Sequence, residues 1–417
     1  MLPLGSRRRH GSTASLLVGM ALSLLVCLAL STHSRLLDYT VARINVKVTS
    51  SEQYFYHKQD WQQWSEGGTQ KCRAPVADEV IPHLLSVRQW HSCKPRQLES
   101  ATLVTQLSLE RLEMLENQCR IWPDPIAAVV YVPTVQGRAA SAEDASLNGS
   151  VLAEAVGRAT AFFNRMQLQG ACTLDLELVT QNFKSEEEAG LYPFNAARNR
   201  ALLLAQTEAL LLLDADFVPS PTIVASYKSP QGYAELLRRL NRPGAVILPA
   251  FETADNGTEG QQLALAAVHG GKAFAAEAYQ QHNLLGFHMA HYAGGHGPTN
   301  YTRWVATSKY YWIRYQSGYE PYVIVSRRFC PWYDERFRGY GYDKIQQLEH
   351  LASEHVNFFV HPHGFVVHVP HEKAPTFGIT HRTGHWDRLY KMFKDVQSQL
   401  RRHRFVPVTS FPQLCQQ

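Results

Sequence analysis

Charged residues are scarce in this sequence: Asp, Glu, Lys and Arg together make up 18% of its 417 residues. Arg7, Arg8 and Arg9 form the only run of three basic residues, and the formal net charge is only +5. Proteins that bind nucleic acids usually carry clustered basic residues, so this class is disfavoured. Apolar residues account for 45%, which excludes a largely disordered chain and indicates a folded protein.

Closely spaced cysteines are also lacking. No Cys-x-x-Cys pair occurs, which argues against a cysteine-ligated zinc site of the common kind. Apart from Cys27, the cysteines are Cys72, Cys93, Cys119, Cys172, Cys330 and Cys415. An even number in an oxidising compartment favours disulfides, but the spacing does not decide which cysteines pair.

Long apolar runs without charge are limited to Ala14–Leu30, which follows the three arginines. A helix of this length spans about 25 Å, enough for a thin bilayer of the early secretory pathway. The positive-inside rule places residues 1–13 in the cytosol and the bulk of the chain in the lumen. We expect an uncleaved transmembrane anchor, and a cleaved signal peptide is the alternative. The sequons at Asn148, Asn256 and Asn300 are compatible with lumenal glycosylation.

The pattern of apolar residues predicts an α/β fold with a single Rossmann-like sheet. We expect a stem and cap region over residues 31–120, with a helix over 97–120, and a catalytic domain over 121–417. The strands expected in that domain cover residues 126–132, 174–179, 209–213, 245–251, 319–325 and 364–369. The expected helices cover residues 151–168, 261–281, 344–352 and 386–404.

The predicted strand over 209–213 ends at the most informative motif, Asp214-Ala215-Asp216. Pro219 and Pro221 follow and prevent the strand from continuing. In open α/β sheets, ligands bind at the carboxyl ends of the strands. Two carboxylates at such an end can share a divalent cation, which in turn can carry a diphosphate. Two solvated acids in a polar turn are the alternative.

Two further segments are candidate binding surfaces. Residues 192–200 (YPFNAARNR) open the helix before this strand, where Asn195 and Arg198 could meet a nucleotide base or phosphate. A capped surface helix is the alternative. A His- and Gly-rich loop over 288–302, too polar for the core, precedes aromatic residues that could stack on sugars: Trp304, Tyr310, Tyr311 and Trp312.

The C-terminal third contributes acids and histidines. Residues 333–344 (YDERFRGYGYDK) contain Asp334, Glu335 and Asp343 beside glycines that allow close approach of the backbone. The histidines that follow are His361, His363, His368 and His371. Strand alternation separates the first two from His368, so a four-histidine zinc site is disfavoured. We expect His368 alone to complete the cation site.

In order and spacing, several segments resemble glycosyltransferase family 49, the family of dystroglycan-modifying glucuronyltransferases. These segments are YPFNAARNRAL, LLLDADFVPS, VILPAFET, NYTRW, YEPYVIV, YDERFRGYGYDK and GFVVHVPH, within residues 125–395. The resemblance implies a GT-A fold, a UDP-sugar donor, Mn²⁺ and an inverting transfer, in a type II membrane protein of the Golgi.

The resemblance also implies roles for single residues. Asp214, Asp216 and His368 would hold the metal ion, which stabilises charge on the departing diphosphate. An inverting transfer needs one general base for the acceptor hydroxyl, and the candidates are Asp343, Glu335 and Asp334. Members of the family tend to carry Asn at the position of Asp343, so a base shared by the whole family would not be this acid.

The resemblance points to UDP-glucuronic acid as the donor. A buried carboxylate needs a charged partner, and Arg198 and Arg303 are the candidates, with Arg303 favoured for the sugar. Another UDP-sugar (galactose, xylose or N-acetylglucosamine) is the alternative among enzymes, and a non-catalytic Golgi chaperone or scaffold is the alternative outside them. The expected acceptor is a glycan or glycoprotein, and oligomers with other Golgi transferases are compatible with this function.

Overall fold

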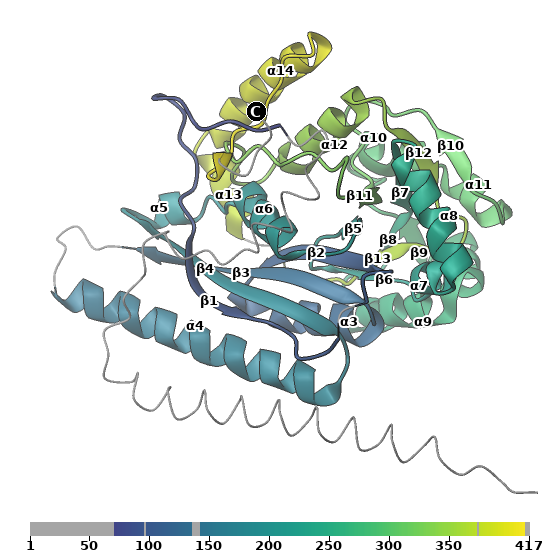
Figure 1. The fold of residues 1–417 in the computed structure, drawn as a ribbon, viewed down its shortest axis with the longest axis horizontal. Helices are drawn as coiled ribbons and strands as arrows, with labels where there is room; N and C mark the ends of the chain where they lie inside the picture. Colours follow the sequence, from purple (N-terminus) through teal and green to yellow (C-terminus); the bar gives the residue numbers. More distant parts are fainter. Residues whose placement is uncertain (1–70, 96, 136–141, 373–374, 413–417) are drawn as a thin grey trace, which may run out of the picture. The chain divides into compact units, whose positions relative to one another are not determined.

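The computed structural model describes residues 71–95, 97–135, 142–372 and 375–412 (Figure 1). The elements discussed below lie within one compact unit of the chain. The expected anchor, Ala14–Leu30, lies outside the described residues. Among the helices of the described part, none is both long enough and apolar enough to cross a membrane.

The strands form two β-sheets (Figure 1). The larger sheet has the strand order β1-β4-β3-β2-β5-β11-β7-β12-β10. Its strands are β1 (Leu85–Trp90), β2 (Ala101–Ser108), β3 (Pro125–Val135), β4 (Thr173–Phe183), β5 (Ala209–Leu212), β7 (Gly244–Leu248), β10 (Tyr311–Ile313), β11 (Tyr322–Ser326) and β12 (Asn357–Val360). The smaller sheet, of order β6-β13-β8-β9, contains β6 (Phe217–Pro219), β8 (Ala250–Thr253), β9 (Leu284–Gly286) and β13 (Val366–His368). The α/β architecture is confirmed, but the expectation of a single sheet is wrong.

The helices pack mainly around the larger sheet. They are α3 (Leu112–Ile121), α4 (Ala142–Gln169), α5 (Glu186–Ala189), α6 (Phe194–Leu204), α7 (Thr222–Tyr227), α8 (Pro230–Asn241), α9 (Thr258–Gln280), α10 (Ala293–His296), α11 (Tyr301–Ala306), α12 (Asp343–Ser353), α13 (Pro375–Arg382) and α14 (His385–Arg401), with 3₁₀ turns η1 (Leu109–Arg111) and η2 (Gly297–Thr299). Alternate residues of β3 divide between two cores. Ala127 and Val129 belong to the cluster that contains α6, whereas Ala128 and Val130 belong to the cluster that contains α3 and α4. Helices therefore cover both faces of the parallel strands.

Several elements agree with the sequence-based predictions. The predicted strands over 126–132 and 174–179 lie within β3 and β4, and the predicted helix over 151–168 lies within α4. The strand before the Asp-Ala-Asp motif is also confirmed, as β5.

The helix expected over residues 97–120 is wrong for its first half. Ala101–Ser108 forms β2, a central parallel strand, and helix α3 starts only at Leu112. Leu103 and Leu107 have helical spacing, but both are buried in the strand. A strand buried on both faces shows no alternation of polar and apolar residues, so its pattern is ambiguous. The sheet thus extends into the segment that we expected to form a stem and cap.

The strand expected over 245–251 is likewise two strands. Pro249 separates β7 from β8, which belong to different sheets. The loop over 288–302 contains two helical turns and the buried residues His296 and Thr299, contrary to the expectation that it is too polar for the core.

The aromatic residues after this loop are mostly structural. Trp304 is fully buried and donates from Nε1 to the carbonyl oxygen of His361 at 3.0 Å. Tyr311 is buried, and its hydroxyl donates to the carbonyl oxygen of Thr299 at 2.7 Å. Neither can be a sugar-stacking platform, whereas Trp312 is exposed.

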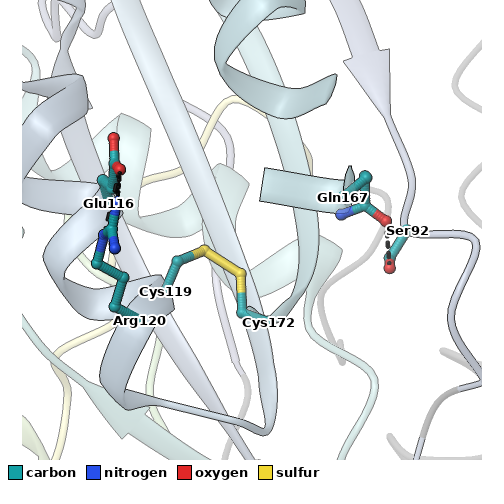
Figure 2. Close-up of a disulfide and its surroundings, with 6 residues drawn as sticks. All are labelled: Ser92, Glu116, Cys119, Arg120, Gln167 and Cys172. Carbon is teal, nitrogen blue, oxygen red and sulfur yellow. Dashed lines mark hydrogen bonds and ion pairs between the residues drawn. A yellow bond between two sulfur atoms is a disulfide. The ribbon is translucent and has the colours of Figure 1, made fainter. Parts of the chain in front are cut away.

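One disulfide fixes the end of α3 to the start of β4. Cys119 and Cys172 are 53 residues apart in sequence, and Figure 2 shows the bond beside the Glu116–Arg120 ion pair. Cys72 is disulfide-bonded as well. The expectation of disulfides is confirmed for these three cysteines, whereas the buried Cys330 forms none with any described residue.

The order of the parallel strands creates a switch point. The chain passes from β2 to β3 and β4 on one side, and then returns to β5 on the other side of β2. Such switch points lie where ligands bind in open α/β sheets, at the carboxyl ends of the strands. The carboxyl end of β5 leads directly to Asp214.

Candidate active site

The turn between β5 and β6 carries Asp214 and Asp216 from the larger sheet to the smaller one. Gln118 of α3 donates from Nε2 to the carbonyl oxygens of Asp214 and Phe217, at 3.0 and 2.8 Å. The backbone N–H of Phe217 also donates to the carbonyl of Asp214, at 3.1 Å. A buried side chain thus holds the turn from inside, and the two carboxylates point from a fixed backbone.

Strand pairing brings two histidines to Asp216. Strands β6 and β13 are antiparallel, and His368 lies opposite Phe217. Asp216 Oδ2 lies 3.1 Å from His371 Nε2 and 3.9 Å from His368 Nε2. One ligand atom from each of these three side chains lies within 4.8 Å of the others. With bonds of about 2.0–2.2 Å to nitrogen and oxygen, a single divalent cation can contact all three.

The electrostatics of this cluster suit a cation. Asp216 Oδ1 is buried and has no hydrogen-bond partner in the described part of the chain. Burial raises the pKa of Asp216, but the hydrogen bond with His371 and the proximity of His368 and Arg111 outweigh it and lower the pKa overall. Burial lowers the pKa of His368, which favours the neutral imidazole that binds metals. One carboxylate and two imidazoles suit a first-row divalent metal ion.

Asp214 has a different environment, because both of its oxygens already accept hydrogen bonds. Arg198 Nη2 donates to Oδ1 at 2.9 Å, while the Tyr322 hydroxyl and Lys344 Nζ donate to Oδ2 at 2.8 and 3.2 Å. Burial alone would raise the pKa of Asp214, but the charges of Lys344 and Arg198 hold it well below its ordinary value. The carboxylate of Asp214 is therefore not one of the groups that converge on the candidate metal site.

Arg198 links Asp214 to a second acid. Its Nη1 donates to Asp343 Oδ2 at 2.5 Å and to Asn195 Oδ1 at 3.1 Å. Asn195 in turn donates from Nδ2 to the carbonyl oxygens of Asp334 and Asp343, at 2.9 and 3.2 Å. Both side chains are buried and bound to protein groups. Both side chains position the acids, and Arg198 also lines a pocket beside Asp214, so the expected contact of these residues with a nucleotide stays a prediction.

A pocket opens beside Asp214 at the switch point between β2 and β5. It is lined by Val104, Thr105, Gln106, Arg198, Leu212, Leu213, Asp214, Pro321, Tyr322, Val323, Tyr333, Lys344, Gln347 and Leu348. Strands β5 and β11 contribute mainly apolar side chains, whereas β2 adds the polar Thr105 and Gln106. The charged groups Arg198 and Lys344 gather at Asp214. Such a combination is typical of small-molecule sites.

Comparison with known proteins identifies the family. Residues 100–401 match the model of glycosyltransferase family 49, described as glycosyl-transferase for dystroglycan. The chain belongs to this family. Similar proteins include the xylosyl- and glucuronyltransferases LARGE2s of Gallus gallus (30% identical over 284 residues) and LARGE2 and LARGE1 of Homo sapiens (29% over 290 and 30% over 279 residues). The aligned regions cover 67%, 70% and 67% of this chain and 33%, 35% and 32% of the relatives, so the match spans about a third of their length.

Two of the candidate bases in this family 49 chain are inaccessible. Asp334 and Glu335 are both 0% exposed. Asp334 is paired with Arg336, at 2.5 Å from Oδ2 to Nη2. Glu335 accepts hydrogen bonds from Asn199 Nδ2 and the backbone N–H of Ser410, and burial raises its pKa to about 7. Neither carboxylate reaches the surface in this structure, so the geometry does not favour either acid as the base.

The third candidate, Asp343, does lie at the site. It begins α12 after a sharp turn in which Gly341 has φ 119°. A Cβ at Gly341 would stand 2.4 Å from the ring of Trp386, so glycine is required there. The Asp343 side chain is 16% exposed and held by Arg198.

Arg303, the favoured partner for a donor carboxylate, lies elsewhere on the surface. It is exposed on α11, with its guanidinium 4.3 Å from the centre of the Tyr311 ring. Within the described residues, no hydrogen bond or ion pair joins it to Asp214 or Asp216, so the structure does not support this role.

Sequence reasoning missed several residues of the candidate site: Arg111, Gln118, Glu320, Tyr322, Lys344 and His371 as a candidate ligand. Lys344 directly follows Asp343, and Glu320 and Tyr322 lie within the family-like segment YEPYVIV, so the motifs already contained a signal. Arg111 and Gln118 gave none, because their segment was predicted as a helix outside the catalytic domain.

Proposed function

We propose that this glycosyltransferase of family 49 transfers a sugar from a UDP-sugar to a glycan acceptor with inversion, using Mn²⁺ held by Asp216, His368 and His371. The observation that carries the proposal is the convergence of these three side chains at the carboxyl edge of the sheet, beside an unpartnered oxygen of Asp216. The site lies where nucleotides bind in open α/β sheets.

The protein groups around this site have distinct tasks. When bound, the cation would act as a Lewis acid that stabilises charge on the diphosphate. Arg111, whose Nη1 lies 3.4 Å from Asp216 Oδ2, adds positive charge on the same side. Asp214 orients Arg198 and Lys344 rather than binding the ion itself. In a single displacement, the acceptor oxygen bonds to C1 as the bond from C1 to UDP breaks.

UDP-glucuronic acid is the donor that we propose. Several relatives are named xylosyl- and glucuronyltransferases, which supports glucuronic acid or xylose over other sugars. The two sugars differ by the carboxylate that only glucuronic acid carries. Lys344 and Arg198 are the cationic groups that line the pocket beside Asp214, so they replace Arg303 as the candidates for meeting that carboxylate.

The same proposal extends to location. We infer a type II Golgi membrane protein whose catalytic part faces the lumen. The Cys119–Cys172 disulfide supports an oxidising compartment. The sequon residues Asn256 and Asn300 are exposed, as glycosylation requires.

A donor screen tests the proposed activity. The full-length chain with Mn²⁺ should release UDP and transfer sugar fastest from UDP-glucuronic acid. UDP-xylose should turn over about 10–100-fold more slowly, because it lacks a charged hydrogen bond worth about 1.5–3 kcal/mol. UDP release and product formation measure both rates, and chelation of Mn²⁺ is the control.

Two outcomes of this screen would contradict the proposal. Equal turnover of UDP-glucose and UDP-glucuronic acid would reject the donor but leave the transferase standing. No UDP release from any UDP-sugar would favour the non-catalytic chaperone or scaffold.

A further inference from the structure

Glu320 lies at the edge of the candidate site, just before strand β11. It lies two residues before β11, which runs antiparallel to β5 with Val323 opposite Leu212. The start of β11 therefore lies at the end of β5, where Asp214 follows. The backbone N–H of Glu320 donates to the carbonyl oxygen of Gly295 at 2.9 Å, which fixes the residue against the turn of α10.

The side chain of Glu320 is connected to the site by one ammonium group. Its Oε2 lies 3.9 Å from Lys344 Nζ, and Lys344 Nζ lies 3.2 Å from Asp214 Oδ2. Lys344 therefore lies between Asp214 and Glu320, and Glu320 is farther from the candidate metal site than Asp214. A base must stand apart from the diphosphate, because in an inverting displacement the acceptor approaches C1 from the face opposite the leaving group.

Glu320 also differs from the other acids by being free to accept a proton. The carboxylate of Asp214 accepts three hydrogen bonds, and Asp343 is bound to Arg198. The Glu320 carboxylate accepts no hydrogen bond from the residues that the structure describes, and its side chain is 21% exposed. Its lone pairs are therefore open to an incoming hydroxyl.

An exposed aromatic ring lies beside this carboxylate. Tyr292 is 43% exposed, and its hydroxyl donates to the carbonyl of Gly318 at 3.0 Å. A Cβ at Gly295 would stand 2.7 Å from the Tyr292 ring and 3.1 Å from Glu320 Oε1. The Tyr292 ring and the Glu320 carboxylate therefore both lie close to Gly295. A pyranose could pack its apolar face on this ring with a hydroxyl toward Glu320.

We propose that Glu320 is the general base of the transfer, which takes the proton from the acceptor hydroxyl. The inference rests on the proposed function. As the acceptor oxygen bonds to C1 of the donor sugar, the bond from C1 to the diphosphate oxygen breaks and its electron pair leaves with UDP. The proton of the hydroxyl moves to a carboxylate oxygen of Glu320.

The acid–base properties of Glu320 agree with this role. Burial raises its pKa to about 7, a shift that the charges of Asp343 and Asp214 assist and that of Lys344 opposes. A base with a pKa near the working pH is effective in proton transfer. The titratable or charged groups that interact with it are Lys344, Asp343, Asp214, Arg198, Tyr292, Tyr315, Tyr322 and Tyr340.

The test compares Glu320→Gln with wild type in the full-length chain. The substitution removes the proton acceptor and keeps the shape, so kcat should fall about 10²–10⁴-fold while Mn²⁺-dependent UDP affinity stays unchanged. Glu235→Gln on α8 is the matched control, because the partly exposed Glu235 pairs only with Arg238 and Arg239 of its own helix among the described residues, and it should transfer at the wild-type rate.

The pH profile adds a second readout. Wild-type kcat/KM should fall as the pH drops below about 7, because protonated Glu320 cannot accept a proton. The residual rate of Glu320→Gln should lack this fall. Should that variant fail to fold, Glu320→Asp, which keeps the carboxylate, should retain both measurable transfer and the pH-dependent fall.

The outcomes separate this inference from the proposed function. An active wild type whose Glu320→Gln variant transfers within a few-fold of its rate overturns only the role of Glu320. A loss of UDP affinity equal to the loss of rate also overturns it, since Glu320 would then be a binding residue. A wild type that transfers no sugar from any UDP-sugar overturns both.

Discussion

Substitution of Asp216 by Asn should reduce Mn²⁺-dependent sugar transfer by about 10³-fold or more, because several kcal/mol of charge stabilisation would be lost. Asn keeps the size of the side chain but removes the negative charge that His368 and His371 face. The fold should survive, because the residue lies in a turn fixed by Gln118 through its backbone. Transfer rate, UDP affinity with Mn²⁺ and the thermal midpoint are the measurements.

The control for this substitution is Asp387→Asn, which makes the same chemical change at an exposed position in the first turn of α14. It should alter neither the rate nor the UDP affinity. Near-wild-type transfer by Asp216→Asn would show that the cation is not held by this residue.

Replacement of Glu177 by Ala should lower the free energy of unfolding by about 3–5 kcal/mol. Glu177 of β4 is fully buried and forms an ion pair with Arg200 of α6, whose Nε lies 3.2 Å from Oε2. Without the carboxylate, the guanidinium of Arg200 stays buried but loses its ion pair with Glu177, which is strongly unfavourable. Urea unfolding monitored by fluorescence and circular dichroism gives the change.

The double variant Glu177→Met/Arg200→Met is the informative comparison. It removes both charges and fills the space with apolar groups, so it should be markedly more stable than Glu177→Ala. If the two variants were equally destabilised, lost packing rather than the loss of the ion pair would be the cause.

The elements predicted best from sequence are those with a clear local pattern. Strand β3 is a short apolar run rich in β-branched residues, and helix α4 has apolar residues at helical spacing. Strand β2 was mistaken for a helix because leucines at positions 103 and 107 fit both structures, and only its neighbours β3 and β5 decide the outcome. The structure of this segment is decided by its pairing with distant strands, which a short stretch of sequence does not reveal.

The candidate site shows the same division. Asp216 and His368 follow from a motif at a strand end and a histidine on a nearby strand. Whether an acid of the site forms an ion pair depends on basic side chains from other helices and strands. The spacing of residues in the sequence does not reveal these pairs. Arg198 illustrates this, because its position at the start of a helix suggests phosphate binding, yet its guanidinium is bound to Asp214 and Asp343.

The central claim, that Asp216, His368 and His371 hold the cation, can be measured directly by electron spin-echo envelope modulation of Mn²⁺ bound to the full-length chain. Imidazole ligands impose nitrogen modulation on the manganese signal, whereas carboxylate and water ligands do not. The wild type should show coupling to two histidine nitrogens, and His371→Ala should show one. Manganese bound without any histidine nitrogen coupling would contradict the claim.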